Sequence, residues 1–292
     1  TLKDLEMANL KEIRNRISSI GSTMQITSAM KMVSAAKLKK AQDAITAMRP
    51  YSSKLTELLQ NLSATLDSDA GGAYSKQREV SKVLLVVVTS NRGLCGGFNS
   101  SVIKETTQNI VANYQGVDVD LLTIGKKGND ILSKSYPVID VRNDIFDNLT
   151  FDYVAEVAEK IMKLYSDGTY DKIEIIYNRF KNAATQIPQV EQFLPIKPVE
   201  GDTNASADYI FEPSKEKIVL ELIPKSLKTQ LYKAVRDSFA AEHGARMTAM
   251  HKATDNATEL RDELKLTYNK ARQAAITNEI LEIVGGAEAL KN

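Results

Sequence analysis

An uninterrupted helical pattern over residues 1–62 constrains the fold of this chain more than any other feature. The segment has no proline before Pro50 and a single glycine, Gly21. Its apolar residues return in alternating steps of three and four, which is the spacing of a coiled-coil seam. They are Leu10, Ile13, Ile17, Ile20 and Met24, and the register resumes at Leu38, Ala41, Ile45, Met48 and Leu55. The pattern predicts one long helix that needs a partner helix.

Between these two runs the seam loses its apolar character. The register falls there on Thr27, Lys31 and Ser34. A second apolar stripe lies on the neighbouring face of the helix and consists of Ile26, Met30 and Val33. One interpretation is a local stutter in the coiled coil. The other is that this face contacts a second partner, and periodicity alone leaves both interpretations open.

The C-terminal segment, residues 212–292, returns to a helical pattern. Pro224 lies inside it and is expected to kink or break the helix. A three-four register follows, with a seam rich in small residues: Ala253, Ala257, Leu260, Leu264, Thr267, Ala271, Ala274, Asn278 and Leu281. A second stripe lies beside it at Ile276, Ile280 and Ile283. Both terminal helices are too long for the intervening domain to bury, so we expect them to pair as a long antiparallel coiled coil.

The middle of the chain has a different character. Residues 63–80 are polar and contain glycine, which predicts a connector. Residues 81–211 alternate apolar runs with helical patterns, and the run 83–88 is apolar throughout, as in a strand buried on both faces. Strands are expected at 83–88, 117–124, 138–141, 172–178 and, antiparallel, 186–194, with helices at 100–115, 127–134 and 151–165. The sequence therefore predicts an α/β fold, with a Rossmann-like sheet domain between two long helices.

A glycine-containing loop, RGLCGG at residues 92–97, follows the first predicted strand. Dinucleotide-binding domains hold a phosphate at this position. However, the glycines at 93, 96 and 97 do not have the G-x-G-x-x-G spacing, and Gly125-Lys126-Lys127 stands where an acidic residue is expected. The phosphate loop G-x-x-x-x-G-K-[ST] is also missing. We therefore expect a tight turn that depends on glycine backbone angles, with no nucleotide beside it.

Other chemistry is sparse in this sequence. Cys95 is the only cysteine, which excludes an internal disulfide, and we expect it to be a small core or loop residue. His243 and His251 are eight residues apart, whereas metal-binding pairs on a helix prefer four. No apolar run approaches the roughly 20 residues that span a bilayer. We identify no catalytic, cofactor-binding or metal-binding residue.

The N-terminal helix is basic although the whole chain carries a net charge of only +1. Residues 1–50 contain nine lysines and arginines against four aspartates and glutamates, a local net charge of +5. Such a helix suits an acidic protein surface or nucleic acid. Nucleic acid is disfavoured because no aromatic residue interleaves with the basic ones. A nucleotide-binding α/β protein and a basic coiled-coil nucleic-acid-binding protein remain as alternative functions.

Several segments resemble the gamma subunits of F-type ATP synthases. Two of them are ITSAMKMVSAAK at residues 26–37 and SNRGLCGGFN at 90–99, although the family usually has an acid where this chain has Asn91. Further matches are DYIFEP at 208–213, ARMTAM at 245–250, YNKARQAAITNEI at 268–280 and EIVGGA at 282–287. Because these segments span essentially the whole chain in the right order, the chain is identified as a member of this family.

The resemblance implies a central-stalk rotor subunit with no catalytic residues of its own. In this family the terminal helices form an antiparallel coiled coil inside a hexamer of alternating alpha and beta subunits. The sheet domain forms a foot that meets an epsilon-type subunit and the membrane rotor ring. Transmembrane ion flow turns the ring and the foot, and the asymmetric shaft biases each catalytic site on a beta subunit toward an open or a closed state. The resemblance thus implies coupling of ion flow to ATP synthesis and hydrolysis.

The resemblance also implies which residues contact partners. Expected contacts with the hexamer are Ile26, Met30, Lys31, Val33, Arg246, Arg272, Gln273, Thr277, Glu279 and Glu282. Expected contacts of the foot with the ring are Tyr209, Phe211 and Glu212. We expect a subunit peripheral to the membrane, without cofactor or nucleic acid. Met7-Ala8-Asn9-Leu10 resembles a bacterial start, which favours the cytoplasmic side of a bacterial plasma membrane over the matrix side of the mitochondrial inner membrane.

Overall fold

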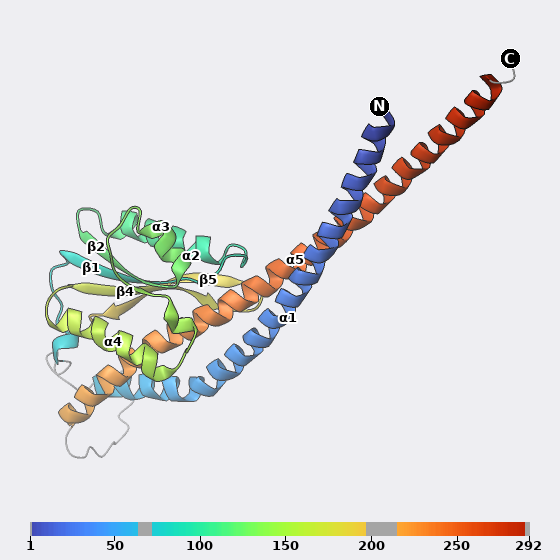
Figure 1. Cartoon of the computed structure of the whole chain (residues 1–292). Coiled ribbons are helices and arrows are strands. Elements are labelled where there is room, and N and C mark those ends of the chain that lie inside the picture. The colour runs from blue at the N-terminus through green and yellow to red at the C-terminus, as the bar shows by residue number, and fades with distance from the viewer. Residues whose placement is uncertain (1, 64–71, 197–214, 290–292) are drawn as a thin grey trace. The chain divides into compact units, whose positions relative to one another are not determined.

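The computed structural model describes residues 2–63, 72–196 and 215–289 (Figure 1). The chain divides into two compact units, a coiled-coil unit of residues 1–33 and 247–292 and a sheet unit of residues 34–246. Helix α1 (Leu2–Ser63) and helix α5 (Lys215–Ala289) each contribute to both units. The sequence pattern predicts boundaries where the terminal helices end, which gives the segments 1–62, 63–80, 81–211 and 212–292. The compact units instead divide the chain within α1 and within α5.

The sheet unit contains a five-stranded sheet in the order β3-β2-β1-β4-β5. The strands are β1 (Lys82–Val88), β2 (Asp118–Ile124), β3 (Val138–Arg142), β4 (Lys172–Phe180) and β5 (Gln186–Leu194). The first four strands are parallel, and β5 pairs antiparallel with β4. The predicted Rossmann-like, mainly parallel sheet is confirmed, including its antiparallel edge strand.

The helices between the strands also match the prediction to within a few residues. They are α2 (Phe98–Asn113), α3 (Lys126–Leu132) and α4 (Phe151–Ser166). The described residues also include two 3-10 helices that the sequence pattern does not predict, η1 (Gly72–Tyr74) and η2 (Asp144–Phe146). Turns of three residues are too short to produce a periodic pattern, so no sequence signal identified them.

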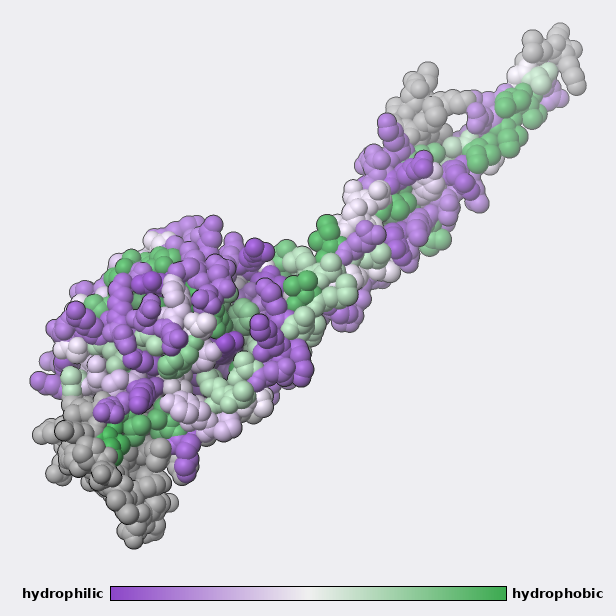
Figure 2. All heavy atoms as spheres, turned by 60° about the horizontal axis from the view of Figure 1, so that its bottom comes forward, coloured by the Kyte–Doolittle hydropathy of each residue, from purple (hydrophilic) through white to green (hydrophobic). Residues whose placement is uncertain are grey.

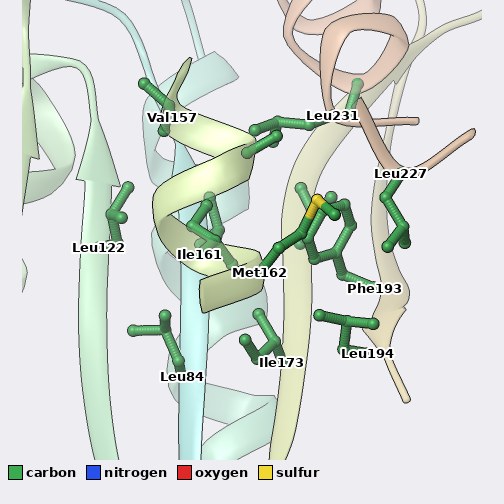
Figure 3. Close-up of a cluster of buried hydrophobic side chains, with 14 of the residues drawn as sticks. Leu84, Leu122, Val157, Ile161, Met162, Ile173, Phe193, Leu194, Leu227 and Leu231 are labelled. Carbon is green, nitrogen blue, oxygen red and sulfur yellow. The ribbon is translucent and has the colours of Figure 1, made fainter. Parts of the chain in front are cut away.

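Strand β1 is buried on both faces, and its side chains alternate between two hydrophobic layers. Leu84 belongs to one layer, together with Ile161 of α4 and Leu231 of α5 (Figure 3). Leu85 belongs to the other layer, which includes Val102 of α2. An apolar run without alternation requires a helical cover on each face, and the fold supplies both.

Helix α5 provides part of the first layer. Ile223, Leu227, Leu231 and Val235 recur every four residues, and each is at most 5% exposed. Of the two predicted effects of Pro224, a kink or a break, the break is wrong, because α5 continues through it. A proline inside a helix costs about 3 kcal/mol. Burying the two neighbouring side chains, Ile223 and Leu227, stabilises this segment by about 3 kcal/mol or more, which offsets that cost.

In the coiled-coil unit, α1 and α5 run antiparallel. Thr27 Oγ1 lies 2.8 Å from Thr254 Oγ1, and Thr258 Oγ1 donates to Met24 Sδ at 3.3 Å. Residue numbers along α1 therefore fall as those along α5 rise. The predicted antiparallel pairing of the terminal helices is confirmed.

The seam of α1 is continuous through the region in which its apolar character is lost. Positions 10, 13, 17, 20, 24, 27, 31 and 34 are buried or half-buried in unbroken three-four order. Thr27 and Ser34 are only 8% and 2% exposed, whereas Ile26 and Val33 are 60% and 57% exposed. The interpretation as a stutter is wrong, because the polarity of the seam changes while its register does not.

The seam of α5 differs in part from the predicted one. The predicted positions Ala253, Ala257, Leu264 and Ala271 are buried or half-buried, but Leu260, Thr267, Ala274, Asn278 and Leu281 are exposed. Half-buried residues one position later replace three of them, at Arg261, Tyr268 and Ala275. The prediction counted apolar residues, whereas a long polar side chain can cover a seam with its aliphatic part. Arg261 is half-buried at the seam, and its Nη1 donates to Met24 Sδ at 3.6 Å.

Gly125, which follows β2, provides a test of the close packing at the ends of the strands. Its φ is +99°, and an added Cβ would lie 2.2 Å from the Thr89 carbonyl oxygen. We expect Gly125→Ala to lower the free energy of unfolding by more than about 3 kcal/mol, because backbone strain and a backbone clash add. Gly116 has a φ of +76° with nothing within 4 Å of an added Cβ. Gly116→Ala should therefore cost only about 1 kcal/mol.

Urea unfolding of the purified chain, followed by circular dichroism, measures both variants. Equal losses for the two substitutions would contradict a steric role for Gly125.

Candidate functional site

The loop between β1 and α2 forms a tight turn. Leu94 and Gly96 have positive φ values of 63° and 58°. The Ser90 amide donates to Asn99 Oδ1 at 2.9 Å, and Ser90 Oγ donates to the Arg92 carbonyl at 2.7 Å. These bonds close the loop on itself, while Leu94 remains 68% exposed.

Cys95 belongs to this loop, and its side chain is buried in a hydrophobic cluster. It is 1% exposed and packs with Phe98, Ala241 and Ala245, so the prediction of a small core or loop residue is confirmed. Burial raises the pKa of its thiol, although a hydrogen bond with Ser90 opposes the shift. A thiol kept protonated in apolar surroundings is a poor nucleophile.

Arg246 of α5 holds the loop from its other side. Its Nη2 donates to the Arg92 carbonyl at 3.2 Å and to Glu242 Oε1 at 2.6 Å, and its Nη1 donates to the Gly93 carbonyl. Arg246 and Glu242 are 7% and 8% exposed. Burial raises the pKa of Glu242, although Arg246, Lys37 and Arg92 oppose the shift. The loop thus presents carbonyl oxygens to a cation, whereas a phosphate loop presents N–H groups to an anion.

Side chains fill the place at which Rossmann-like domains bind ligands, beyond the carboxyl ends of the strands where the strand order reverses. Here that point lies between β1 and β4. Asn178 of β4 is fully buried, accepts from Ser101 Oγ at 3.2 Å and donates to the Phe98 carbonyl at 2.8 Å. Phe180 of the same strand packs against the cluster that contains Ala241 of α5. Helix α5 therefore lies where a ligand would lie in a nucleotide-binding domain.

His243 is a buried residue of α5 between the aromatic Phe239 and the Glu242–Arg246 pair. It is 5% exposed, and its ring centroid lies 4.5 Å from that of Phe239. Its Nδ1 has no hydrogen-bond partner among the described residues. Burial lowers the pKa of His243 to about 4, and the positive charges of Lys37 and Arg246 add to the effect. Within residues 2–63, 72–196 and 215–289, no group of three histidine, cysteine or acidic side chains could hold a metal ion.

The predicted hexamer contacts on α1 differ in their exposure. Ile26 and Val33 point away from the seam, and Met32 beside them is also 64% exposed. Met30 is half-buried beside the seam, and Lys31 is half-buried at a seam position. Large apolar side chains that gather on an exposed helix face are typical of an interaction surface.

The C-terminal part of α5 carries a second such surface. Every side chain from Ile276 to Glu288 is exposed, and Figure 2 shows hydrophobic residues gathered near this end of the helix. Its apolar members, each 47–66% exposed, are Ile276, Ile280, Leu281, Ile283 and Val284. The predicted contact residues Arg272, Gln273, Thr277, Glu279 and Glu282 lie exposed in or next to this stretch.

The remaining predicted contacts have other outcomes. Tyr209, Phe211 and Glu212 lie outside the described residues. Arg246 is buried against the glycine loop, apart from the exposed contact residues. Its partner Glu242 stands four residues earlier on the same helix, a spacing that favours an ion pair and could have indicated this pairing from the sequence.

Known proteins match this chain over nearly its whole length. The family model described as ATP synthase matches residues 9–290. The ATP synthase gamma chain of Flavobacterium psychrophilum is 74% identical over 286 residues, which cover 98% of this chain and 100% of the relative. The chain belongs to the ATP synthase gamma family. The ATP synthase gamma chain of Cytophaga hutchinsonii is 54% identical over 295 residues, which cover 98% of this chain and 100% of the relative.

The identification predicted from the motifs is therefore confirmed: as a member of the gamma family, the chain is a central-stalk subunit of F-type ATP synthase. The central stalk and c-ring structure of the Tetrahymena thermophila mitochondrial ATP synthase includes a chain 28% identical, with a TM-score of 0.60, over 78% of this chain and 99% of that one. A chain of the Euglena gracilis mitochondrial ATP synthase is 22% identical with a TM-score of 0.69, over 97% of this chain and 95% of that one, which shows the fold alone. Within the described part of this gamma-family chain, no helix combines the length and the apolar character needed to cross a membrane.

His243 makes the stability of this gamma-family fold depend on pH. The unfolded chain binds a proton at His243 near pH 6.5, but the folded chain does so only near pH 4. The unfolded state therefore holds more protons between these values, so the free energy of unfolding falls as the pH falls from 6.5 to 4. We expect His243 to account for at most about 3 kcal/mol of this loss.

The measurement is thermal or urea unfolding at pH 7 and pH 4.5 of the wild type, His243→Gln and His251→Gln. His251 is the only other histidine and is exposed on the same helix. The His243 variant should lose less stability on acidification than the other two proteins, and identical pH dependence in all three would contradict the assignment.

Proposed function

We propose that the chain works as the rotating shaft of its ATP synthase, with no catalytic residue of its own. The observation that carries this proposal is the set of large apolar side chains exposed on the coiled-coil unit, on both α1 and α5. A helix pair that faced only water would carry polar residues at these positions. Such side chains suit a surrounding sleeve of protein, which in this family is the hexamer of alpha and beta subunits.

On α1, the proposed contact with the hexamer consists of Ile26, Met30, Lys31 and Val33. Ile26 and Val33 are seven residues apart and therefore share one helix face. Lys31 and the basic residues that follow, among them Lys37, would meet acidic loops of the beta subunits. Lys39 is a weaker candidate, because its ammonium already pairs with Asp43 at 2.9 Å.

On α5, the proposed contact consists of Arg272, Gln273, Thr277, Glu279 and Glu282 with the apolar stripe beside them. Hydrophobic contact is non-directional, so an apolar stripe on one side of the helix needs no exact partner geometry and stabilises whichever subunit surface it faces. Polar residues beside it make directional contacts that differ from one orientation to the next. This combination suits a shaft that turns within its sleeve and also signals its orientation.

The physical basis of coupling is differential contact. A subunit can favour its open state in one shaft orientation and its closed state in another only if its contacts with the shaft differ in free energy between the two orientations. Shifting a two-state equilibrium from 1:99 to 99:1 requires about 5.5 kcal/mol. At about 25 cal/mol per Å² this equals roughly 220 Å² of apolar surface. Two or three large apolar side chains supply that area, which is the scale of the exposed stripes described above.

Two finer parts of the proposal concern the membrane end of the complex. Tyr209, Phe211 and Glu212 are proposed to contact the rotor ring, beside an epsilon-type subunit. The chain is proposed to act at the cytoplasmic side of a bacterial plasma membrane. Its relatives with 74% identity come from two Flavobacterium species, which supports a bacterial setting.

Co-expression with the alpha and beta subunits of the same organism tests the proposed function. We expect the chain to co-purify with them as one copy in an ATPase of hexameric size. Equilibrium dialysis of the chain alone with labelled ATP serves as the control for a nucleotide-binding protein. Failure to assemble, or tight stoichiometric ATP binding by the chain alone, would overturn the proposal.

Truncation of α5 tests the shaft surface itself. Removing residues 276–292 deletes the exposed apolar stripe, and we expect ATP-driven ion pumping in membrane vesicles to fall several-fold while the complex still assembles. Removing only residues 285–292 keeps Ile276–Val284 and serves as the matched control. Equal pumping by the two truncated forms would show that the stripe does not contribute to coupling.

A further inference from the structure

We propose that Arg246 is a positioning residue that anchors helix α5 to the glycine loop of the sheet unit and thereby passes torque from the sheet into the helix. This inference rests on the proposed function as a rotating shaft. It assigns Arg246 an intramolecular role, in place of the contact with the hexamer that the family resemblance implies.

The position of Arg246 along α5 supports an anchor. It is the last residue that α5 contributes to the sheet unit, and the coiled-coil unit begins at Met247. Torque that enters α5 from the sheet must therefore be transferred before or at this residue. An attachment at the end of the shared segment limits how far the helix can twist inside the sheet unit.

The earlier attachments of α5 are mainly of another kind. Ile223, Leu227, Leu231 and Val235 hold the helix by apolar burial. The hydrogen bonds from Gln230 to the Gln192 carbonyl and from Arg236 to the Leu149 carbonyl lie ten or more residues before Arg246, away from the end of the shared segment. Because hydrophobic contact is non-directional, it opposes separation of the helix from the sheet more than rotation about the helix axis. A planar guanidinium that donates in fixed directions opposes rotation as well.

The guanidinium of Arg246 has three acceptors in two different elements. Two are consecutive carbonyl oxygens of the loop, at Arg92 and Gly93, and the third is the Glu242 carboxylate on α5 itself. The carboxylate fixes the orientation of the guanidinium on its own helix, and the carbonyls tie it to the loop. Because Arg246 and Glu242 are more than nine-tenths buried, water cannot readily replace these partners.

A second close approach restricts the same stretch of α5. At Gly244 an added Cβ would lie 3.1 Å from Ala183 Cα and 3.2 Å from the Ala183 carbonyl oxygen, in the turn between β4 and β5. The helix backbone therefore lies directly against this turn within three residues of Arg246. Close backbone packing and directional hydrogen bonds together fix the helix where it leaves the sheet unit.

Cys95 reports on the anchor. It is a buried residue of the loop that Arg246 holds, and it is the only cysteine of the chain. Opening of the loop would expose the thiol, so its rate of alkylation by iodoacetamide measures the opening equilibrium. In the full-length purified chain, we expect Arg246→Gln to accelerate labelling of Cys95 by about tenfold or more, because hydrogen bonds of a buried charge are lost.

Arg236→Gln is the matched control. Arg236 is also on α5 in the sheet unit and also donates to a backbone carbonyl, that of Leu149 at 2.9 Å, but it does not contact the glycine loop. It should leave the labelling rate unchanged. Arg246→Lys should accelerate labelling nearly as much as Arg246→Gln, since one ammonium does not reproduce the planar fork.

A double variant separates the anchor from its buried partner. Arg246→Gln leaves Glu242 buried without its cation, which by itself destabilises the fold. Arg246→Gln with Glu242→Gln removes that charge and should still label fast, because the ties to the loop remain broken. Labelling that returns to the wild-type rate in the double variant would assign the effect to the unpaired carboxylate and overturn the proposal.

The effect of the anchor on coupling is measured in the assembled ATP synthase, as the number of ions pumped per ATP hydrolysed. We expect the double variant to hydrolyse ATP but to pump several-fold fewer ions per ATP than the wild type, while Arg236→Gln pumps normally. If the double variant labels Cys95 fast but pumps normally, the anchor exists but does not transmit torque. If the double variant labels Cys95 at the wild-type rate, Arg246 does not anchor the loop. Both results overturn this inference but leave the proposed function intact, since that function fails only if the wild-type chain does not assemble or if it binds ATP tightly on its own.

Discussion

The burial of β1 on both faces is the constraint on which the rest of the structure depends. Its run of apolar residues needs one cover from α2 and α3 and another from α4 and α5. Helix α5 begins more than 120 residues after β1 ends, so the sheet is completed only when the C-terminal helix packs on it. The helix that extends into the coiled coil is thus also part of the core of the sheet unit, and neither unit is independent of it.

The packing of helix α5 also explains why this Rossmann-like sheet lacks the open crevice in which such folds bind nucleotides. A Rossmann-like sheet opens a crevice at the reversal of strand order, and here Phe180, Ala241 and their neighbours close it. The glycine loop beside that crevice turns its carbonyl oxygens toward Arg246. The polarity of the loop is therefore opposite to that of a phosphate site.

The sequence predicted most of the architecture, and its failures have identifiable physical reasons. Strands and helices were found because alternation and apolar runs depend on local burial. Leu260 was predicted in the seam but is exposed, and Arg261 is half-buried in its place, because the facing helix as well as polarity decides which residues form a seam. The helix does not break at Pro224, because tertiary burial outweighs a local preference. Arg246 was expected on a surface, and only the fold brings the loop at residues 92–93 to it.

The polar layer of the coiled coil has a consequence for how the two helices are aligned. Thr27 and Thr254 face each other hydroxyl to hydroxyl at 2.8 Å. If the helices slipped by one heptad, Thr27 would face Met247 or Arg261 instead, and the loss of this pair would cost about 1 kcal/mol. Apolar seams tolerate such slippage better, since one leucine resembles the next. The hydroxyl pair therefore fixes the register of the two helices and opposes their sliding along each other when the shaft is under load.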